Sequence, residues 1–124
     1  MKIAIPRYRG RVSPRFGFTE DVLVMELEGE KIIGQETLAL DGCLPHEIPR
    51  LLHERGVHVV LTGGINAVFQ EMFRALGILV IWGLIGTPQE ALSAYMAGVQ
   101  SPAPGQCLRR RMRRARGRGH RMES

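Results

Sequence analysis

The chain has 124 residues, a formal net charge of +5, and 44% hydrophobic residues. This length suits one domain with a single core, and the longest apolar runs are too short to span a bilayer, so a soluble protein without membrane contact is expected. The opening "MKIAIP" lacks the long apolar segment of a signal peptide, which favours a cytoplasmic location. The two cysteines, Cys43 and Cys107, lie too far apart in the sequence to indicate a disulfide framework.

The positive charge is concentrated at the C-terminus. From Gln106 onward the sequence holds eight Arg and one Glu, whereas residues 1–105 hold nine Lys and Arg against eleven Asp and Glu. The composition therefore predicts a mildly acidic folded domain over 1–99, followed by a Pro-rich linker and a disordered Arg-rich tail over 100–124. An Arg-rich tail can bind phosphates, so an alternative function is weak nucleic-acid binding through the tail; a solvated appendage without a partner is the other interpretation.

The apolar patterns predict an α/β domain with the element order βββαβαβα and a mixed sheet. The first strand is "KIAIP", the next two form a hairpin in which Leu23, Met25 and Leu27 define an apolar face, and alternating helices and strands follow. Val68, Phe69, Met72, Phe73 and Leu76 form one helical stripe. The predicted ranges after the first strand are 21–40 for the hairpin, helices 46–56, 66–77 and 87–98, and strands 57–64 and 78–83.

The last predicted helix carries a complete start signal. Thr87 is placed as the N-cap, Pro88 as the first helical residue and Glu90 at the reciprocal capping position. Gly98 ends the pattern, so the helix is expected to stop there.

Two glycine turns follow the predicted parallel strands. Gly63 and Gly64 come after one strand, and Gly83 and Gly86 precede Thr87 after the next. Ligands prefer the carboxyl edge of such a sheet, where these glycines let the backbone approach a ligand and offer it free amides. Glycines at strand ends are also ordinary turn residues. Neither turn is a dinucleotide fingerprint or a P-loop, so no nucleotide cofactor is expected.

The stretch "IPRYRGRVSPRFG" places Arg7, Arg9, Arg11 and Arg15 directly after the first strand. If that strand ends at the same sheet edge, the four guanidinium groups form an anion site over the crevice. A solvated loop is the alternative. Within "SPRFG", Phe16 offers an apolar anchor and Gly17 permits an unusual φ.

Cys43 and His46 lie just ahead of the first helix. A thiol beside a helix N-terminus is favoured as thiolate, and an imidazole three residues on can bind the same metal. Two ligands make only half a site, so a loop cysteine with a solvated histidine is the alternative. His53 and His58 are expected to be an exposed residue and a strand residue instead of ligands.

Together, "KIAIP", "GRVSPRFG", "IPRLLHERGVHVVLTGGI" and "ALGILVIWGLIGTPQEALSAYMAG" resemble the dinitrogenase iron-molybdenum cofactor biosynthesis family, the NifX and NafY-like domain that also forms the C-terminal part of NifB proteins. The resemblance covers residues 1–99. It implies a ribonuclease H-like fold with a mixed five-stranded sheet and helices on both faces. It also implies non-catalytic binding or carriage of an iron-sulfur or iron-molybdenum cluster, in cofactor assembly or storage, with cofactor-assembly proteins as partners and nitrogen fixation as one context.

The resemblance adds three family loops to the anion site predicted from the arginines. The family's "SPxFG" loop corresponds to residues 13–17, its glycine turn to 63–66 with Asn66 in the left-handed conformation, and its last turn to 83–87. Arg15 stands where relatives often have His, which favours anion capture over metal ligation, and His46 with Cys43 is the predicted metal-binding pair. The full cluster-binding set is Arg7, Arg9, Arg11, Ser13, Arg15, Phe16, Gly17, Gly63, Gly64, Asn66, Gly83, Gly86 and Thr87.

Overall fold

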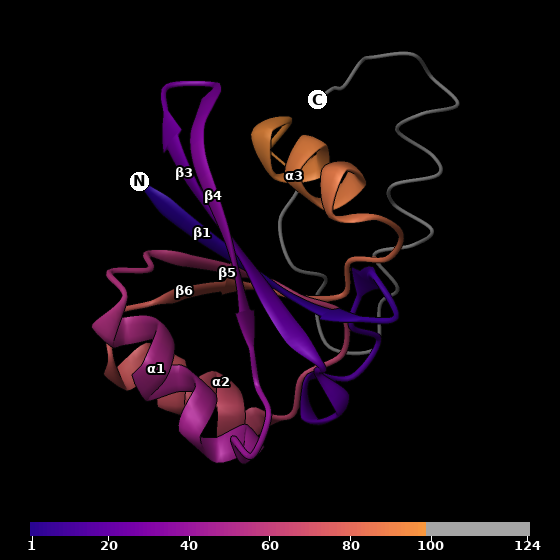
Figure 1. The fold of residues 1–124 in the computed structure, drawn as a ribbon, viewed down its shortest axis with the longest axis vertical. Coiled ribbons are helices and arrows are strands. Elements are labelled where there is room, and N and C mark those ends of the chain that lie inside the picture. The colour runs from indigo at the N-terminus through magenta and orange to yellow at the C-terminus, as the bar shows by residue number, and fades with distance from the viewer. Residues whose placement is uncertain (99–124) are drawn as a thin grey trace.

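The computed structural model describes residues 1–98 (Figure 1). The predicted linker and tail (100–124), and with them the nucleic-acid alternative, lie outside the described residues and stay predictions. The elements are β1 (Lys2–Tyr8), β2 (Arg11–Val12), η1 (Phe16–Phe18), β3 (Asp21–Glu28), β4 (Lys31–Ala39), η2 (Pro45–Glu47), α1 (Ile48–Glu54), β5 (Val59–Leu61), α2 (Ala67–Ala75), β6 (Leu79–Ile81) and α3 (Pro88–Met96).

The strands form one mixed sheet in the order β4-β3-β1-β5-β6, with β2 paired to β1. β1 is central: it runs antiparallel to β3 on one side and parallel to β5 on the other. Because β5 and β6 are also parallel, β1, β5 and β6 all end at the same edge of the sheet. We call this the carboxyl edge.

The sheet has six strands instead of the expected five, because the Arg-rich loop folds back on β1. Tyr8 lies opposite Arg11, and Arg9 and Gly10 form the turn between them with φ values of 55° and 78°. Two residues with positive φ are typical of a type I′ hairpin turn. Arg rarely takes a positive φ, and the usual sequence signal for such a turn is an Asn-Gly or Asp-Gly pair. Because this chain has Arg9-Gly10 instead, its sequence did not predict the hairpin.

Helices cover both faces of the sheet (Figure 1). α3 packs on one face, where its buried residues Ala91 and Ala94 meet side chains of β1, β3, β5 and β6. α1 and α2 pack on the other face, where Ile48, Leu52 and Phe73 are fully buried or nearly so. The sheet is therefore the middle layer between two apolar cores.

The β3–β4 hairpin confirms the predicted alternation. Leu23, Met25 and Leu27 face the α3 core, while Val22 and Val24 face the core under α1 and α2. β4 is an edge strand and is exposed along almost its whole length.

The predicted stripe on α2 is wrong at one position. Phe73 is fully buried, but Val68 is 66% exposed, because it lies in the first turn of the helix at the rim of the sheet.

No helix among residues 1–98 is long and apolar enough to cross a membrane.

The start of α3 is as predicted. The Thr87 side chain accepts a hydrogen bond from the Glu90 amide at 3.1 Å, and the Glu90 carboxylate accepts one from the Thr87 amide at 2.9 Å. The helix ends at Met96, and Gly98 follows with φ of 90°.

Candidate functional site

Two loops join at the carboxyl edge, one after β2 and one after β5. The Gly63 amide donates to the Ser13 carbonyl at 3.1 Å, and the Gly64 amide donates to the Pro14 carbonyl at 2.7 Å. The Phe16 amide donates back to the Gly64 carbonyl at 2.8 Å. These bonds continue the parallel pairing beyond the end of β5, and Arg15 pairs with Gly64 as a parallel bridge.

The close approach of the two loops explains the glycine pair. A Cβ at Gly63 would lie 2.3 Å from the Ser13 carbonyl oxygen, and one at Gly64 would lie 2.9 Å from that of Pro14. The prediction that these amides are free for a ligand is therefore wrong, because both donate to the neighbouring loop. The Gly83 amide is also used, since it donates to the Gly63 carbonyl at 2.9 Å.

Ser13 and Phe16 fix the loop from inside. Ser13 is fully buried, and its hydroxyl donates to the Arg15 carbonyl at 2.6 Å. Phe16 is 1% exposed and makes edge-on ring contacts with Phe69 and Phe73, with centroids 4.9 and 5.5 Å apart. These contacts attach the loop to α2, so the position of Arg15 is set on both sides by buried neighbours.

An open cleft of about 410 Å³ lies where this loop meets the start of α2. One cationic side chain, Arg15, lines it, together with the apolar or aromatic side chains of Phe16, Phe18, Ile65 and Phe69. Gly17, Gly64 and Asn66 complete the lining. A guanidinium beside an apolar wall suits an anion whose surface is only weakly hydrated.

The N-terminal end of α2 opens at the same cleft. Asn66 is the N-cap: its side chain accepts from the Phe69 amide at 3.0 Å, while the amides of Ala67 and Val68 have no acceptor inside the helix. Asn66 has φ of −81°, so its predicted left-handed conformation is wrong. An N-cap residue requires an extended backbone. The partial positive charge at the N-terminal end of α2 adds to the charge of Arg15.

Gly17 also differs from its prediction. It lies in η1, and its φ is not in the positive range that favours glycine, so it has no unusual backbone conformation. A Cβ at this position would meet nothing within 4 Å.

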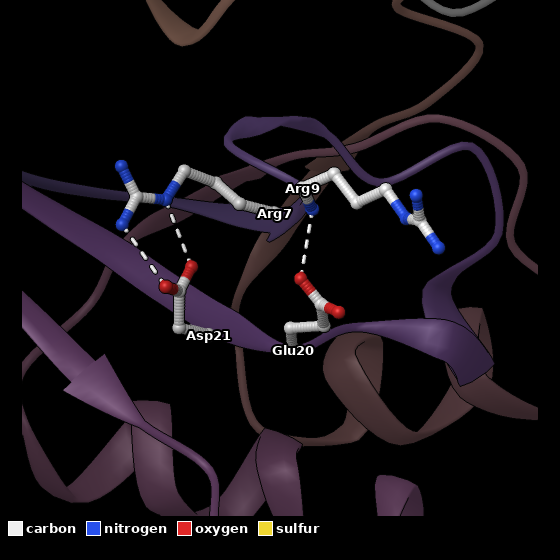
Figure 2. A network of polar contacts seen from close by, with 4 residues as sticks. All are labelled: Arg7, Arg9, Glu20 and Asp21. Carbon is white, nitrogen blue, oxygen red and sulfur yellow. Dashed lines mark hydrogen bonds and ion pairs between the residues drawn. The ribbon is translucent and has the colours of Figure 1, made fainter.

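The structure separates the four arginines that the sequence grouped. Arg7 forms a two-bond ion pair with Asp21, with Nε–Oδ1 of 2.8 Å and a second bond of 3.1 Å from its terminal nitrogen (Figure 2). Arg9 and Arg11 belong to the β1–β2 hairpin and do not line the cleft. Of the four arginines predicted to share one crevice, Arg15 alone lines the cleft. Arg7 is held elsewhere because it lies directly opposite Asp21 in the β1–β3 register.

The second glycine turn serves α3 and the hairpin. Thr87 caps α3, and the Gly86 carbonyl accepts from the Val12 amide at 2.9 Å. Gly86 has φ of 101°, and a Cβ there would lie 2.1 Å from a Glu90 carboxylate oxygen, so the capping arrangement requires glycine. Gly83, Gly86 and Thr87 do not line the cleft.

Cys43 and His46 lie on the neighbouring segment around η2, which packs against η1. Partial burial raises the pKa of the Cys43 thiol above its ordinary value, and the nearby Glu47 carboxylate raises it further. The predicted thiolate is thus disfavoured, because burial and, to a lesser extent, the Glu47 carboxylate both oppose the charged form of Cys43. Within residues 1–98, no three His, Cys, Asp or Glu side chains gather into a metal site.

Sequence reasoning missed two residues that line the cleft, Phe18 and Phe69, and it placed Ile65 in the glycine turn without adding it to the cluster-binding set. Phe69 was assigned only to the core stripe, whereas it is half-buried between that core and the cleft. The available signal in the sequence was a second aromatic residue two positions after Phe16. In the structure Phe16 is buried, whereas Phe18 is 61% exposed.

The family model described as "Dinitrogenase iron-molybdenum cofactor" matches residues 1–98, which is the whole described part of the chain. The chain belongs to the dinitrogenase iron-molybdenum cofactor family.

Three relatives of this dinitrogenase iron-molybdenum cofactor family member cover the same domain. The crystal structure of PH0822 has a TM-score of 0.76 and 27% identity, over 85% of this chain and 96% of that one. The apo form of the orange protein from Desulfovibrio gigas has a TM-score of 0.68 and 25% identity, over 84% and 93%. Protein MJ0580 of Methanocaldococcus jannaschii is 28% identical over 105 residues, 79% of this chain and 87% of its own.

Proposed function

We propose that this protein binds and carries a preformed, anionic iron-sulfur or iron-molybdenum cluster during cofactor assembly, without turning over a substrate. The family supports the class of cargo, since its model is described by the iron-molybdenum cofactor of dinitrogenase. The observation that carries the proposal is the cleft in which Arg15 and the N-terminal end of α2 lie beside an aromatic wall.

Arg15 and α2 supply the attraction for negative charge. Arg15 is exposed and has no carboxylate partner among residues 1–98, so its guanidinium is available to a ligand. The N-terminal end of α2 adds the partial positive charge of a helix start, since its N-cap residue Asn66 lines the same cleft. Both groups act on an anion without forming a bond to its metal.

The aromatic wall favours a sulfur-rich surface. Phe18 and Phe69 present ring carbons to the cleft, and sulfur atoms make favourable contacts with aromatic rings. A strongly hydrated oxyanion would lose its water against these rings without gaining enough donors in return. The wall therefore complements the guanidinium by selecting the soft surface of a metal-sulfur cluster.

Cys43 and His46 stay predicted metal ligands in this proposal. They do not line the cleft, but η2 packs against η1, so a cargo seated beside Phe18 lies next to their segment. The cluster would be held mainly by charge and surface contacts, with Cys43 or His46 as an accessory ligand.

The fold and setting of this proposal follow the family resemblance. A mixed sheet between α3 and the α1–α2 pair is compatible with the ribonuclease H-like class, which stays a prediction. Cofactor-assembly proteins are the proposed donors and acceptors of the cargo, and cytoplasmic location stays a prediction as well.

Anaerobic reconstitution tests the proposal. The full chain is incubated with iron, sulfide and molybdate under reducing conditions, separated from unbound material by gel filtration, and analysed for metal, sulfide and visible absorption. We expect coloured protein with metal and sulfide in fixed ratio. Protein that stays colourless and metal-free, also when offered an isolated iron-molybdenum cofactor, would overturn the proposal.

A further inference from the structure

Two of the arginines that the sequence singled out have no role in the cleft. Arg9 and Arg11 are exposed on the β1–β2 hairpin, at the carboxyl edge but outside the cleft lining. Tyr8 lies directly opposite Arg11, so their side chains share one face of the hairpin. The Arg9 guanidinium lies over the Tyr8 ring, 5.3 Å from its centroid. The hairpin thus presents two exposed arginines and one aromatic residue, with the Arg9 guanidinium over the ring.

The base of this hairpin is held rigidly. The Arg7–Asp21 ion pair fixes β1 to β3, and the Glu20 amide donates to the Arg7 carbonyl at 2.8 Å. The Glu20 carboxylate in turn accepts from the Arg9 backbone amide at 2.8 Å (Figure 2). In Figure 2 the Arg9 side chain extends away from these contacts. Asp21 therefore holds the Arg7 side chain and Glu20 holds the Arg9 backbone, while neither carboxylate forms an ion pair with the Arg9 guanidinium, which contacts Tyr8 instead.

The ion pairing of the described arginines is selective. Arg7, Arg55 and Arg74 each pair with a carboxylate, namely Asp21, Glu36 and Glu71. Arg9 and Arg11 have no carboxylate partner among residues 1–98, although acidic residues outnumber basic ones over that part of the chain. Arg9 also takes a positive φ, and it is the only residue other than glycine to do so within residues 1–98. Within the described residues, the fold thus leaves both guanidinium groups at the surface without an ion pair.

We infer that the Tyr8–Arg11 hairpin is a docking element for a protein partner that presents carboxylates on its surface. Tyr and Arg are the residue types enriched at the energetic centres of protein interfaces, and a rigid hairpin loses little entropy on binding. Each guanidinium can bind a carboxylate through two parallel hydrogen bonds. The cargo of the cleft does not enter this inference, because neither arginine lines the cleft.

A nucleic acid fits the hairpin less well. Non-specific binding of nucleic acid needs many phosphate contacts along a basic surface. Here the Glu20 carboxylate binds the backbone amide of Arg9, and residues 1–98 are acidic in sum. A short carboxylate-bearing surface avoids this repulsion, since it needs to approach only the tip of the hairpin.

Residue-resolved NMR on the full chain tests the inference, with an oligoglutamate peptide as the probe and oligothymidylate DNA of equal charge as the comparison. The variant combines Arg9→Asn, which tolerates the positive φ, with Arg11→Gln; Arg50→Gln removes an exposed arginine of α1 as the matched control. Amide signals of residues 8–12 report on the hairpin separately from those of the Arg-rich C-terminal residues.

We expect oligoglutamate to shift the amides of residues 8–12, with an apparent affinity at that site about tenfold weaker in the double variant and unchanged in the control. Retained amide signals for β1 and β3 show that the variant is folded. Shifts that avoid residues 8–12, or that persist in the double variant, would overturn the inference. Oligothymidylate shifting the same amides at lower concentration would also overturn it and assign the hairpin to nucleic acid.

Discussion

The Ser13 carbonyl oxygen accepts a hydrogen bond from the Gly63 amide at 3.1 Å, and no side chain fits between the two loops that this bond joins. A Cβ at residue 63 would also lie 2.9 Å from the Cα of Pro14. The contact fixes the loop that carries Arg15 to the end of β5. The shape of the cleft therefore depends on a glycine that does not line it.

Gly63→Ala tests this contact. The methyl group must push the loop of Ser13 and Pro14 away from β5, so we expect a loss of about 1–3 kcal/mol in the free energy of unfolding. Gly17→Ala is the matched control, because its Cβ meets nothing within 4 Å; its effect should stay within about 0.5 kcal/mol. Chemical denaturation measures both. Equal stability of the two variants would show that the loops separate without cost.

The two phenylalanines of η1 have different expected roles. Phe16 is 1% exposed against Phe69 and Phe73, so Phe16→Ala should cost about 3–5 kcal/mol of unfolding free energy. Phe18 is 61% exposed and lines the cleft, so Phe18→Ala should leave stability within about 0.5 kcal/mol and weaken cluster retention. Thermal melting combined with metal analysis separates the two effects. Full cluster retention by Phe18→Ala would remove the aromatic wall from the proposed site.

Thr87 was a predicted cluster-binding residue, and the structure makes it the cap of α3. Thr87→Ala removes the acceptor of the Glu90 amide and should cost about 1 kcal/mol, whereas Thr87→Ser should keep most of that stability. Neither variant should change cluster retention, since Thr87 lies outside the cleft. A retention defect in Thr87→Ser, with unchanged stability, would return this residue to the site.

The Cys43 thiol should titrate above its ordinary value. Burial and the Glu47 carboxylate both disfavour the thiolate and raise the pKa of Cys43. In a Cys107→Ser background, alkylation by iodoacetamide near pH 8 should be slower for the folded protein than for the same chain unfolded in urea. Glu47→Gln removes one of the two causes and keeps an acceptor for the Leu44 amide, so it should speed alkylation in part. A midpoint of the alkylation rate at lower pH in the folded protein than in the unfolded chain would reinstate the thiolate predicted from the sequence.

Local signals in the sequence predicted the elements well where short-range chemistry determines them. The Thr87–Glu90 capping box and the alternation of Leu23, Met25 and Leu27 appear in the structure as predicted, because hydrogen bonds over three residues and strand periodicity are readable from one segment. The α1–α2 and α3 layers follow from the same patterns.

Long-range pairing accounts for what the sequence did not predict. Arg7 pairs with Asp21 only because β1 and β3 align in one register, and the Gly63 and Gly64 amides are used only because another loop reaches them. The cleft was predicted at the right sheet edge, but the distribution of the four arginines depends on the strand register, which no local pattern in the sequence indicates. Phe18 entered the site through η1, a short element with no periodic signal.

Cluster retention by the Arg15→Ala variant tests the central claim most directly. The variant and an Arg50→Ala control are reconstituted anaerobically beside the parent chain, and bound metal and sulfide are measured after gel filtration. Because Arg15 is exposed and its backbone contacts do not involve the side chain, both variants should melt with the parent. We predict that Arg15→Ala loses about tenfold in cluster affinity while Arg50→Ala matches the parent. Equal retention by all three proteins would contradict the assignment of the cleft as the cluster site.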